Sequence, residues 1–302
     1  MAKAKTAFVC NDCGADYPKW QGQCGECHAW NTLTEIRLSA PAGKRASSGR
    51  NVRNTGFAGS LAPVQKLADV AVSDLPRMGS GFEEFDRVLG GGLVPGSSIL
   101  IGGHPGAGKS TLLLQTLCRL AARYTALYVT GEESPGQIAM RAKRLGLPSD
   151  ELQLLAETDV DAILASAEAL KPAILVVDSI QVVHSETLTS APGSVSQVRD
   201  CAAQLTRYAK QTGTVLILVG HVTKDGSLAG PKVLEHMIDC SILLEGDHDS
   251  RYRTLRGQKN RFGAVNELGI FAMTDGGLKE VSNPSAIFWI ALNTQPRALP
   301  LS

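Results

Sequence analysis

The spacing of apolar residues beyond residue 70 predicts alternating strands and helices. Four continuous apolar runs are typical of strands buried on both faces: Ser98–Ile101, Ala126–Val129, Ala173–Val177 and Thr214–Val219. Helical spacing occupies the segments between and after them, near Ser110–Arg123, Pro135–Leu145, Asp159–Leu170 and Ser194–Gln211. Strands that alternate with helices form βαβ units. The pattern therefore predicts an α/β fold with a mainly parallel central sheet that is covered on both sides.

The first thirty residues follow a different pattern, in which paired cysteines replace apolar runs. Cys10 and Cys13 form one CxxC pair, and after ten residues Cys24 and Cys27 form a second. Two such pairs supply four thiolates, the number that completes a tetrahedral Zn²⁺ shell. So short a stretch has almost no core, so metal binding would supply most of its folding free energy. We predict a structural four-cysteine zinc-binding module over residues 1–35; the alternative is four unligated cysteines.

Residues 36–68 contain no acidic residue, and their charged residues are all basic. Serine, alanine, glycine and proline fill much of the remaining sequence. Low hydrophobicity with like charges predicts a flexible tether, and the alternative is that its basic residues touch phosphate groups nonspecifically. The α/β domain is expected to occupy residues 69–282, and residues 283–302 to form a short tail.

The first apolar run leads directly into a glycine-rich loop, Gly103-His104-Pro105-Gly106-Ala107-Gly108-Lys109-Ser110, which Thr111 follows. This is the pattern G-x-x-x-x-G-K-[ST] in the required strand–loop–helix setting. Glycines let backbone N–H groups wrap closely around phosphate at a helix N-terminus. Lys109 is expected to reach the β- and γ-phosphates, and the Ser110 hydroxyl to hold Mg²⁺. The sequence therefore predicts that ATP and Mg²⁺ bind through residues 103–111.

Two further strand ends place acidic residues beside this loop. Asp178 ends the third apolar run, where a carboxylate is suited to hold Mg²⁺ through water. Glu132 and Glu133 follow the second run. A carboxylate there can orient the water that attacks the γ-phosphate, while Lys109 and the metal stabilise the transition state. We predict this role for Glu132; Glu133 is equally consistent with catalysis and with an acidic residue that favours a helix start.

Composition narrows the class of protein without changing this picture. The 302-residue chain has a formal net charge of +1, which excludes a globally basic nucleic-acid binder but not local basic patches. No apolar run is long enough to span a membrane, and no apolar signal core precedes the first cysteine. We therefore expect a cytoplasmic protein with reduced thiols. Three other cysteines are expected to be small buried hydrophobes: Cys118, Cys201 and Cys240.

Several longer stretches resemble one known family. They are the cysteine pairs with Trp30-Asn31-Thr32, the segment GSGFEEFDRVLGGGLVPGSSILIGGHPGAGKSTLLLQ, and the runs LYVTGEES, LVVDSIQ and GHVTKDGSLAGPKVLEHMID. The most specific is the pentapeptide Lys259-Asn260-Arg261-Phe262-Gly263, because other RecA-like ATPases lack it. With these motifs the chain resembles the bacterial RadA/Sms DNA-repair ATPases from the first cysteine to about residue 288.

The resemblance implies a RecA-like core that assembles into a homo-oligomeric ring, expected to be a hexamer, with ATP between neighbouring subunits. It also implies binding to single-stranded and branched DNA, and branch migration alongside the RecA recombinase. Carried over to this sequence, Lys259 and Arg261 would act on the neighbouring subunit's nucleotide and couple hydrolysis to DNA. A cation supplied across an interface stabilises a transferring phosphoryl group only once that interface has formed. Without the resemblance, a solvated basic turn is the simpler interpretation of the pentapeptide.

Three regions are candidates for sensing nucleotide or binding DNA. His221 follows the fourth apolar run, where RecA-like proteins place a residue that senses the γ-phosphate; the alternative is a hydrogen-bonded surface histidine. The predicted DNA-facing loop is residues 222–235, and its cationic candidates are Lys224, Lys232 and His236. The polar stretch 181–198 is a second candidate. Neither stretch offers stacked aromatic residues, so we expect contacts with the DNA backbone and no sequence reading.

The sequence departs from the family pattern at two places. His104 stands where the family usually has Asp in the phosphate loop, at a variable position of the motif, so we expect activity with altered kinetics. After Phe288 the family usually continues into a domain that resembles the Lon protease, whereas this sequence stops at Ser302. We expect a truncated, frameshifted or naturally short member without protease activity, for which ring stability, duplex binding and full branch migration are not assured.

The leading function is a DNA-dependent ATPase that acts in recombinational DNA repair. One alternative is a zinc-bearing DNA-binding module whose ATPase is idle because the ring cannot close. Another is a P-loop kinase of the KaiC type, which would transfer phosphate to an acceptor without any effect of DNA. Hydrolysis that rises when single-stranded DNA is added would favour the ATPase over both alternatives.

Overall fold

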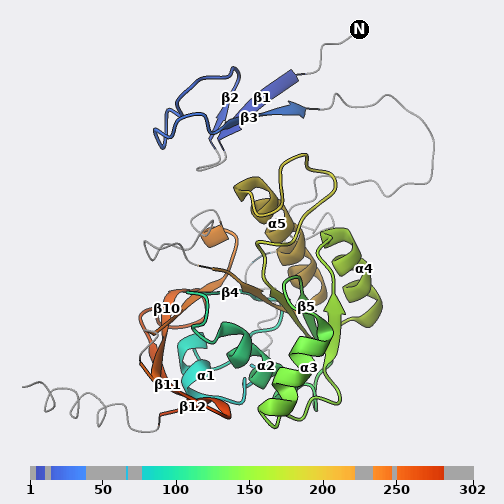
Figure 1. Cartoon of the computed structure of the whole chain (residues 1–302), viewed down its shortest axis with the longest axis vertical. Coiled ribbons are helices and arrows are strands. Elements are labelled where there is room, and N and C mark those ends of the chain that lie inside the picture. The colour runs from blue at the N-terminus through green and yellow to red at the C-terminus, as the bar shows by residue number, and fades with distance from the viewer. Residues whose placement is uncertain are drawn as a thin grey trace, which may run out of the picture.

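The computed structural model of the chain describes residues 5–10, 15–38, 66, 77–221, 234–246 and 250–281. The N-terminal part forms a three-stranded antiparallel sheet in the order β2-β1-β3 (Figure 1). Its strands are β1 (Lys5–Cys10), β2 (Asp16–Tyr17) and β3 (Leu33–Leu38). The buried residues of this module are only Cys10, Cys24 and Leu33 among those described. So small a core gives the module little hydrophobic stabilisation of its own.

The rest of the described chain is built around a nine-stranded sheet with the strand order β12-β11-β10-β9-β4-β8-β7-β5-β6 (Figure 1). Its parallel part consists of β4 (Ser98–Gly103), β5 (Ala126–Thr130), β6 (Gln153–Ala156), β7 (Ile174–Asp178), β8 (Val215–Val219) and β9 (Cys240–Glu245). The four strands predicted from continuous apolar runs are β4, β8, β7 and β5. They lie next to one another at the centre of the parallel part, where both faces are buried.

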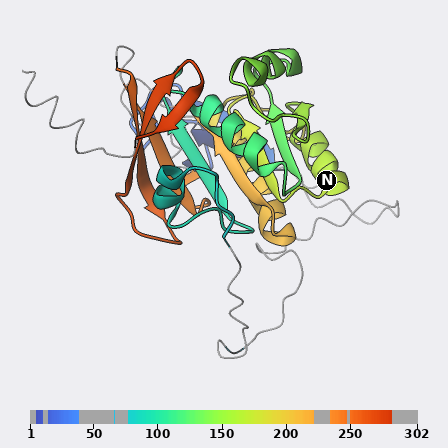
Figure 2. The ribbon, with the colours of Figure 1, turned by 90° about the horizontal axis from the view of Figure 1, so that it is seen from below.

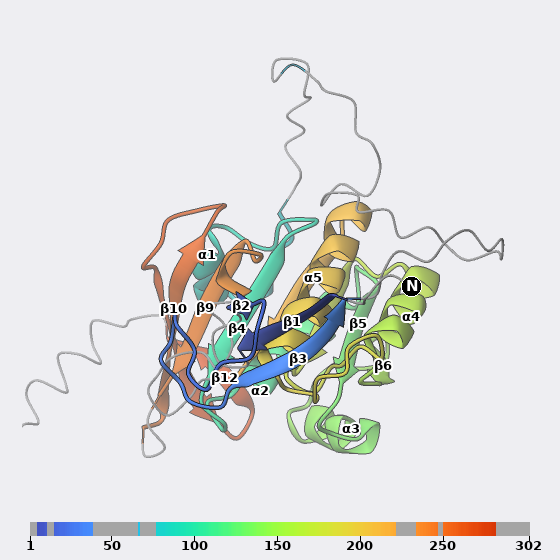
Figure 3. The same cartoon turned by 90° about the horizontal axis from the view of Figure 1, so that it is seen from above.

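Helices cover both faces of this sheet. One face carries α1 (Glu83–Leu89), α2 (Lys109–Leu120) and α3 (Pro135–Arg144), and the other carries α4 (Val160–Leu170) and α5 (Val195–Thr212). Alternation along β4 shows this directly, because Ile99 and Ile101 join the first cluster and Leu100 joins the second. Figure 3 shows α4 and α5 side by side, and the Tyr208 hydroxyl donates a hydrogen bond to the Ala167 carbonyl (2.9 Å). The predicted α/β fold with a mainly parallel sheet is confirmed.

Local sequence signals explain where three of the helices begin. Ser134 caps α3 in a capping box with Gln137, and Pro135 occupies the first turn. Asp159 and Ser194 cap α4 and α5, since each side chain accepts a backbone N–H from the first turn. These caps fix the ends of the helices relative to the strands that they follow.

Three antiparallel strands extend the sheet beyond β9, and the apolar runs of the sequence do not predict them. They are β10 (Tyr252–Asn260), β11 (Leu268–Thr274) and β12 (Gly277–Glu280). Figure 2 shows these strands, in orange to red, curving beside α1, in teal. Leu255, Phe271 and Leu278 are buried in the first helix-covered cluster, and the Phe82 and Phe271 rings pack edge to face at 5.7 Å. The extension therefore shares the core of the parallel sheet.

Cys118, Cys201 and Cys240 are buried, as predicted. Burial raises the pKa of Cys118 to about 11 and those of Cys201 and Cys240 to about 12, so these thiols stay protonated at neutral pH. None of the helices in the described segments has both the length and the apolar character to cross a membrane. Three predicted segments lie wholly or mostly outside the described residues. They are the tether, the tail from residue 283, and residues 222–233 with Lys224 and Lys232.

Candidate nucleotide-binding site

The loop between β4 and α2 curls around the start of α2. Gly106 and Gly108 adopt left-handed backbone angles (φ 80° and 106°), which glycine tolerates at no steric cost. A Cβ atom at Gly108 would lie 2.8 Å from the Met273 methyl group, so the loop also packs closely on β11. Because α2 begins at Lys109, the unpaired N–H groups of its first turn lie next to the loop. This arrangement is suited to bind phosphate.

A cavity of about 370 Å³ lies over this loop, at the carboxyl edge of the parallel strands. Most of the predicted site residues line it: Pro105, Gly106, Gly108, Lys109, Ser110, Thr111, Glu132, Asp178 and His221. Gly103 and His104 lie beside the cavity, where their carbonyl oxygens accept hydrogen bonds from Lys109. Ala107 is buried in the core. The structure thus brings the glycine loop and the strand-end acids of β5 and β7 to one place.

Lys109 is 5% exposed, which is rare for a lysine. Its Nζ atom donates hydrogen bonds to the carbonyl oxygens of Gly103 (2.6 Å) and His104 (3.0 Å). Burial lowers the pKa of Lys109, and the nearby carboxylates of Asp178 and Glu132 offset only part of that shift. The ammonium group is held at the wall of the cavity, where phosphate oxygens can replace the two carbonyl oxygens as acceptors.

Asp178 ends β7, and a buried tyrosine fixes its carboxylate. The Tyr128 hydroxyl donates a hydrogen bond to Asp178 Oδ2 (2.6 Å) from the neighbouring strand β5. Burial and the adjacent carboxylate raise the pKa of Tyr128 well above its ordinary value, so the phenol remains a donor. In the described part of the chain no hydrogen bond engages Asp178 Oδ1. Asp178 and the Ser110 hydroxyl, which line the same cavity, supply the oxygen ligands that Mg²⁺ prefers.

Glu132 reaches across the cavity to residues that follow β7 and β8. Its Oε1 atom accepts hydrogen bonds from the Ser179 hydroxyl and from His221 Nε2 (3.2 Å). His221 Nδ1 lies 3.5 Å from Lys109 Nζ, so the tautomer with its proton on Nε2 suits both neighbours. Burial raises the pKa of Glu132, but Ser179, His221 and Lys109 outweigh burial and hold the pKa below its ordinary value. Glu132 is therefore ionised at neutral pH.

Glu133 has a different environment, although it is the next residue. Its carboxylate forms an ion pair with Arg141 on α3. Its backbone N–H donates a hydrogen bond to Thr130 Oγ1 (3.1 Å), which holds the turn after β5. Both acids line the cavity, but they differ in their partners: Glu132 contacts Ser179 and His221, and Glu133 pairs with Arg141 on α3.

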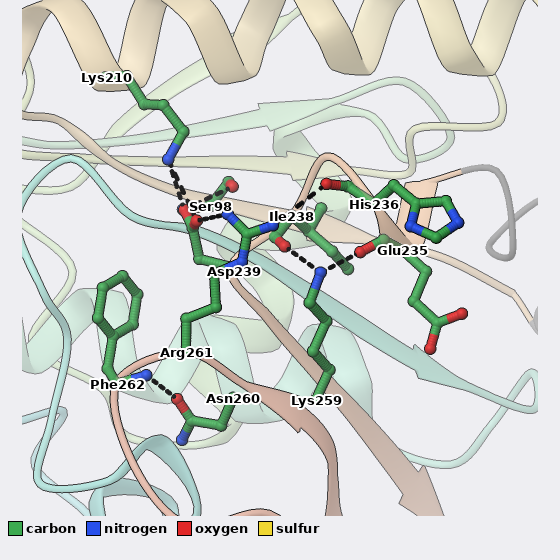
Figure 4. A network of polar contacts seen from close by, with 10 residues as sticks. All are labelled: Ser98, Lys210, Glu235, His236, Ile238, Asp239, Lys259, Asn260, Arg261 and Phe262. Atoms are coloured by element: carbon green, nitrogen blue, oxygen red, sulfur yellow. Dashed lines mark hydrogen bonds and ion pairs between the residues drawn. The ribbon is translucent and has the colours of Figure 1, made fainter.

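Lys259 and Arg261 lie at the opposite edge of the sheet from the cavity. Figure 4 shows the two side chains near Asp239. Asn260, between them, pairs with Cys240 at the start of β9, and Cys240 pairs with Ile99 near the start of β4. The glycine loop follows the other end of β4, about 17 Å away at the usual rise per strand residue. Neither cation can reach the cavity of its own chain. The predicted action of these two cations on a neighbouring subunit stays a prediction.

Three of the four predicted zinc ligands lie among the described residues. The Sγ atoms of Cys10, Cys24 and Cys27 are all within 4.8 Å of one another, and Cys10 and Cys27 are 3.6 Å apart. Thiolates bound at about 2.3 Å to one tetrahedral Zn²⁺ would be separated by about 3.8 Å. The Thr32 hydroxyl lies 3.1 Å from Cys10 Sγ and supports the cluster from outside. The described thiols therefore fit a zinc centre; Cys13 lies outside the described residues.

Of the two predicted DNA-facing stretches, the structure describes residues 181–198 in full. Gln197 is 2% exposed, and its Nε2 atom donates to the carbonyl oxygens of Ser185 (3.2 Å), Leu188 (3.4 Å) and Ser190 (2.9 Å). One buried amide thus holds the backbone of this loop. The stretch contains no Lys or Arg, so it brings no cation to DNA phosphates. Its role in binding DNA stays a prediction.

The glycine loop, the buried lysine and the strand-end acids on a mainly parallel sheet define a P-loop nucleotide-binding domain. A family model described as an AAA domain matches residues 65–227, which is more than half of the chain. A second model, described as a rubredoxin metal binding domain, matches residues 8–35. The chain belongs to the AAA-domain family and has a zinc ribbon at its N-terminal end.

Curated relatives narrow the similarity further. The chain is 66% identical over 291 residues to the DNA repair protein RadA of Escherichia coli, and 65% identical over 290 residues to that of Haemophilus influenzae. It is 48% identical over 293 residues to the DNA repair protein RadA of Bacillus subtilis. Each match covers 95% of this chain and 62% of the relative. The resemblance to the RadA/Sms family is confirmed, and the chain spans 62% of the length of these relatives.

Three partners of the strand-end acids were not predicted from the sequence: Tyr128, Ser179 and Arg141. Tyr128 lies inside an apolar run and therefore looks like an ordinary core residue in the sequence. Its contact with Asp178 follows only from the pairing of the two strands. Ser179 directly follows Asp178 at a strand end, and that position was a usable signal. Arg141 is eight residues from Glu133 and reaches it only because α3 begins between them.

Proposed function

We propose that this chain is a DNA-dependent, Mg²⁺-requiring ATPase that acts in recombinational DNA repair. The observation that carries the proposal is the convergence of Lys109, Asp178 and Glu132 on one cavity over the glycine loop. The curated relatives, which are DNA repair proteins RadA, support the repair role. In this proposal the chain binds single-stranded and branched DNA and promotes branch migration with the RecA recombinase, as part of a hexameric ring.

ATP binding would use the loop and the buried lysine. Backbone N–H groups of the loop and of the first turn of α2 receive the phosphate oxygens, and Lys109 neutralises the β- and γ-phosphates. Ser110 and Asp178 would hold Mg²⁺, which neutralises charge that develops on the phosphates. Tyr128 keeps the Asp178 carboxylate in one orientation through its hydrogen bond to Oδ2. These groups bind the nucleotide and orient its terminal phosphate.

Hydrolysis would use Glu132 to orient the attacking water. Both Ser179 and His221 contact Oε1, which leaves Oε2 as an acceptor for a water hydrogen. The carboxylate is ionised at neutral pH because its pKa is below the ordinary value. The water attacks the γ-phosphorus, its proton leaves toward Glu132, and the bond to the β-phosphate oxygen breaks. Lys109 stabilises the negative charge on the transferring phosphoryl group.

His221 would report the state of the phosphate. Its two ring nitrogens lie 3.5 Å from Lys109 Nζ and 3.2 Å from Glu132 Oε1, so the imidazole connects the phosphate-binding cation to the water-orienting acid. When Lys109 turns toward a phosphate, its contact with Nδ1 weakens and the ring is free to shift. His221 immediately precedes the predicted DNA-facing loop in the sequence, so a shift of the ring is positioned to affect that loop.

Lys259 and Arg261 would complete the site of the neighbouring subunit. Their placement at the edge opposite their own cavity supports this role, because in a head-to-tail ring a neighbour would present its cavity to that edge. Cations added in this way stabilise the transition state only in the assembled ring. Hydrolysis is therefore expected to depend on assembly as well as on the residues within one chain.

The test is steady-state ATP turnover with and without single-stranded DNA, with the molecular mass measured in parallel with and without nucleotide. The expected result is Mg²⁺-dependent turnover that rises with DNA, rings that form with ATP, and loss of turnover in Lys109→Ala. DNA binding without any turnover would support the idle zinc-bearing module instead. Transfer of labelled phosphate to a protein or small-molecule acceptor, with no effect of DNA, would support a kinase.

A further inference from the structure

Asp239 is a buried carboxylate at the amino edge of the sheet, and two cations converge on it (Figure 4). The residue is 2% exposed. Its Oδ2 atom accepts hydrogen bonds from the backbone N–H and the hydroxyl of Ser98 (both 3.0 Å) and from Lys210 Nζ (2.9 Å). Its Oδ1 atom accepts from Arg261 Nη1 (3.2 Å). Asp239 thus joins the start of β4, helix α5 and the pentapeptide that contains Arg261.

The two cations that contact Asp239 differ in solvent exposure. Lys210 extends from α5, and its side chain is 28% exposed, whereas the side chain of Arg261 is 52% exposed. Arg261 Nη1 contacts Asp239, and Nη2 donates weakly to the His236 carbonyl oxygen (3.4 Å). A guanidinium group has five N–H donors. Donors of Arg261 that are not used in these contacts therefore remain for a phosphate group outside the chain.

The short segment before β9 holds the second cation of the pentapeptide as well. Lys259 Nζ donates hydrogen bonds to the carbonyl oxygens of Glu235 and Ile238. The backbone N–H of Arg261 donates to the Asp239 carbonyl oxygen (3.0 Å). Figure 4 shows both side chains directed at this segment. The positions of Lys259 and Arg261 are thus set by residues 235–239, and Asp239 is the only carboxylate among these contacts in the described part of the chain.

We propose that Asp239 is a positioning residue, which holds the guanidinium of Arg261 in the orientation needed to contact the neighbouring subunit's phosphate, while Lys210 keeps Asp239 neutralised. This inference rests on the proposed action of Arg261 across a subunit interface. An exposed arginine samples many rotamers, and ordering it when the subunits meet costs conformational entropy. A fixed carboxylate pays that cost in advance. Lys210 matters because a buried carboxylate without a cation is strongly destabilising.

The first test compares Asp239→Asn with a matched control. The control is Arg256→Gln, which breaks the exposed ion pair of Arg256 with Glu245 on the same strand as Lys259, β10. In Asp239→Asn, kcat for ATP turnover is expected to fall about ten- to a hundredfold, the range for losing a hydrogen bond to a charged group. KM for ATP should change less than about twofold, because the chain's own cavity is intact. Arg256→Gln should leave both constants within about twofold.

The second test separates positioning from a merely structural role by mixing subunits. Asp239→Asn chains have a competent cavity and a misplaced arginine, whereas Lys109→Ala chains have a disabled cavity and a competent arginine. Mixing two nearly inactive proteins should restore turnover to at least about fivefold above their sum, because Lys109→Ala subunits supply the arginine to Asp239→Asn cavities. Mixing Asp239→Asn with Arg261→Gln should restore nothing, since both lack the same contribution.

A double-mutant cycle gives the third test. If Asp239 acts through Arg261, the double variant Asp239→Asn/Arg261→Gln should have a kcat within about twofold of that of Arg261→Gln alone. If Asp239→Asn fails to fold, as judged by its thermal transition, Ser98→Ala serves instead; it removes one hydrogen bond from the carboxylate and should lower kcat severalfold at unchanged KM. Full activity of the folded Asp239→Asn protein, failure of the mixture, or additive effects would each overturn the inference. Absence of turnover in the unaltered chain would instead overturn the proposed ATPase.

Discussion

Two adjacent acids, Glu132 and Glu133, provide the sharpest test of the proposed chemistry. We predict that Glu132→Gln abolishes turnover and that Glu133→Gln does not. Glutamine keeps the shape of the side chain and an oxygen that accepts hydrogen bonds from Ser179 and His221. It cannot accept a proton from water. The substitutions therefore remove one charge at two neighbouring positions while preserving packing.

The magnitudes follow from the different partners of the two acids. A positioned general base contributes about 10²- to 10⁴-fold to a rate, so Glu132→Gln should lower kcat by that factor, or about 3–5 kcal/mol in the barrier. The ion pair of Glu133 with Arg141 is partly exposed, with side chains 35% and 19% accessible. Exposed pairs contribute about 0.2–1 kcal/mol, so Glu133→Gln should lower kcat by no more than about fivefold and slightly reduce the melting temperature.

The assay is single-turnover hydrolysis of radiolabelled ATP at saturating Mg²⁺, with nucleotide affinity measured separately by a fluorescent analogue. Both variants should bind the analogue within about threefold of the unaltered chain, because neither acid is assigned to the phosphates. Because the pKa of Glu132 lies below its ordinary value of 4.5, lowering the pH from about 8 to about 6 should not protonate this group. If Glu133→Gln proved the more damaging of the two, or if both were mild, the assignment of Glu132 would be refuted.

Three further predictions concern other parts of the chain. Tyr128→Phe should keep the fold but raise the Mg²⁺ concentration for half-maximal turnover about tenfold, because Asp178 loses its orienting hydrogen bond; a Mg²⁺ titration measures this. Chelation of zinc should unfold the N-terminal ribbon and weaken DNA coupling while ATP affinity changes less than about twofold; limited proteolysis and analogue binding measure both parts. Burial raises the pKa of Asp239, but its partners Lys210 and Ser98 lower this pKa more. The contribution of Asp239 to folding stability should therefore be present above about pH 4 and be lost as the pH falls through the lowered pKa. Asp239→Asn should flatten that acid dependence in urea unfolding curves, and an unchanged dependence would contradict it.

The sequence predicted the parallel half of the fold because each of its central strands is a continuous apolar run. β4, β5, β7 and β8 lie within two residues of their predicted ends, since burial on both faces leaves no polar interruption. β10 was missed because one of its faces is solvated: Leu255 is buried, while the neighbouring Arg256 is exposed. A nine-residue alternating strand with three charged residues does not resemble a core strand in composition.

The site divides in the same way between local and long-range information. The glycine loop with Lys109 was predictable because the phosphate-binding groups are consecutive in the chain. The separation of Glu132 from Glu133 was not, because it depends on which partner each acid meets after folding: Ser179 and His221 for one, Arg141 for the other. The contact of Asp239 with Arg261 likewise joins residues 22 positions apart, and no spacing rule connects them.

If Arg261 acts on a neighbour as proposed, its placement opposite the phosphate cavity would give each subunit one surface that supplies the arginine and one that receives it. Copies that associate through these two surfaces would all point in the same direction. Every open row of subunits would then end with one cavity that lacks a neighbour's arginine and one arginine that contacts no cavity. Closing the circle removes both ends at once. In such a ring, the loss of one subunit's arginine would inactivate the cavity of the neighbouring subunit and leave the altered subunit's own cavity active. In a ring that mixes altered and unaltered subunits, the defect would therefore appear one subunit away from the substitution.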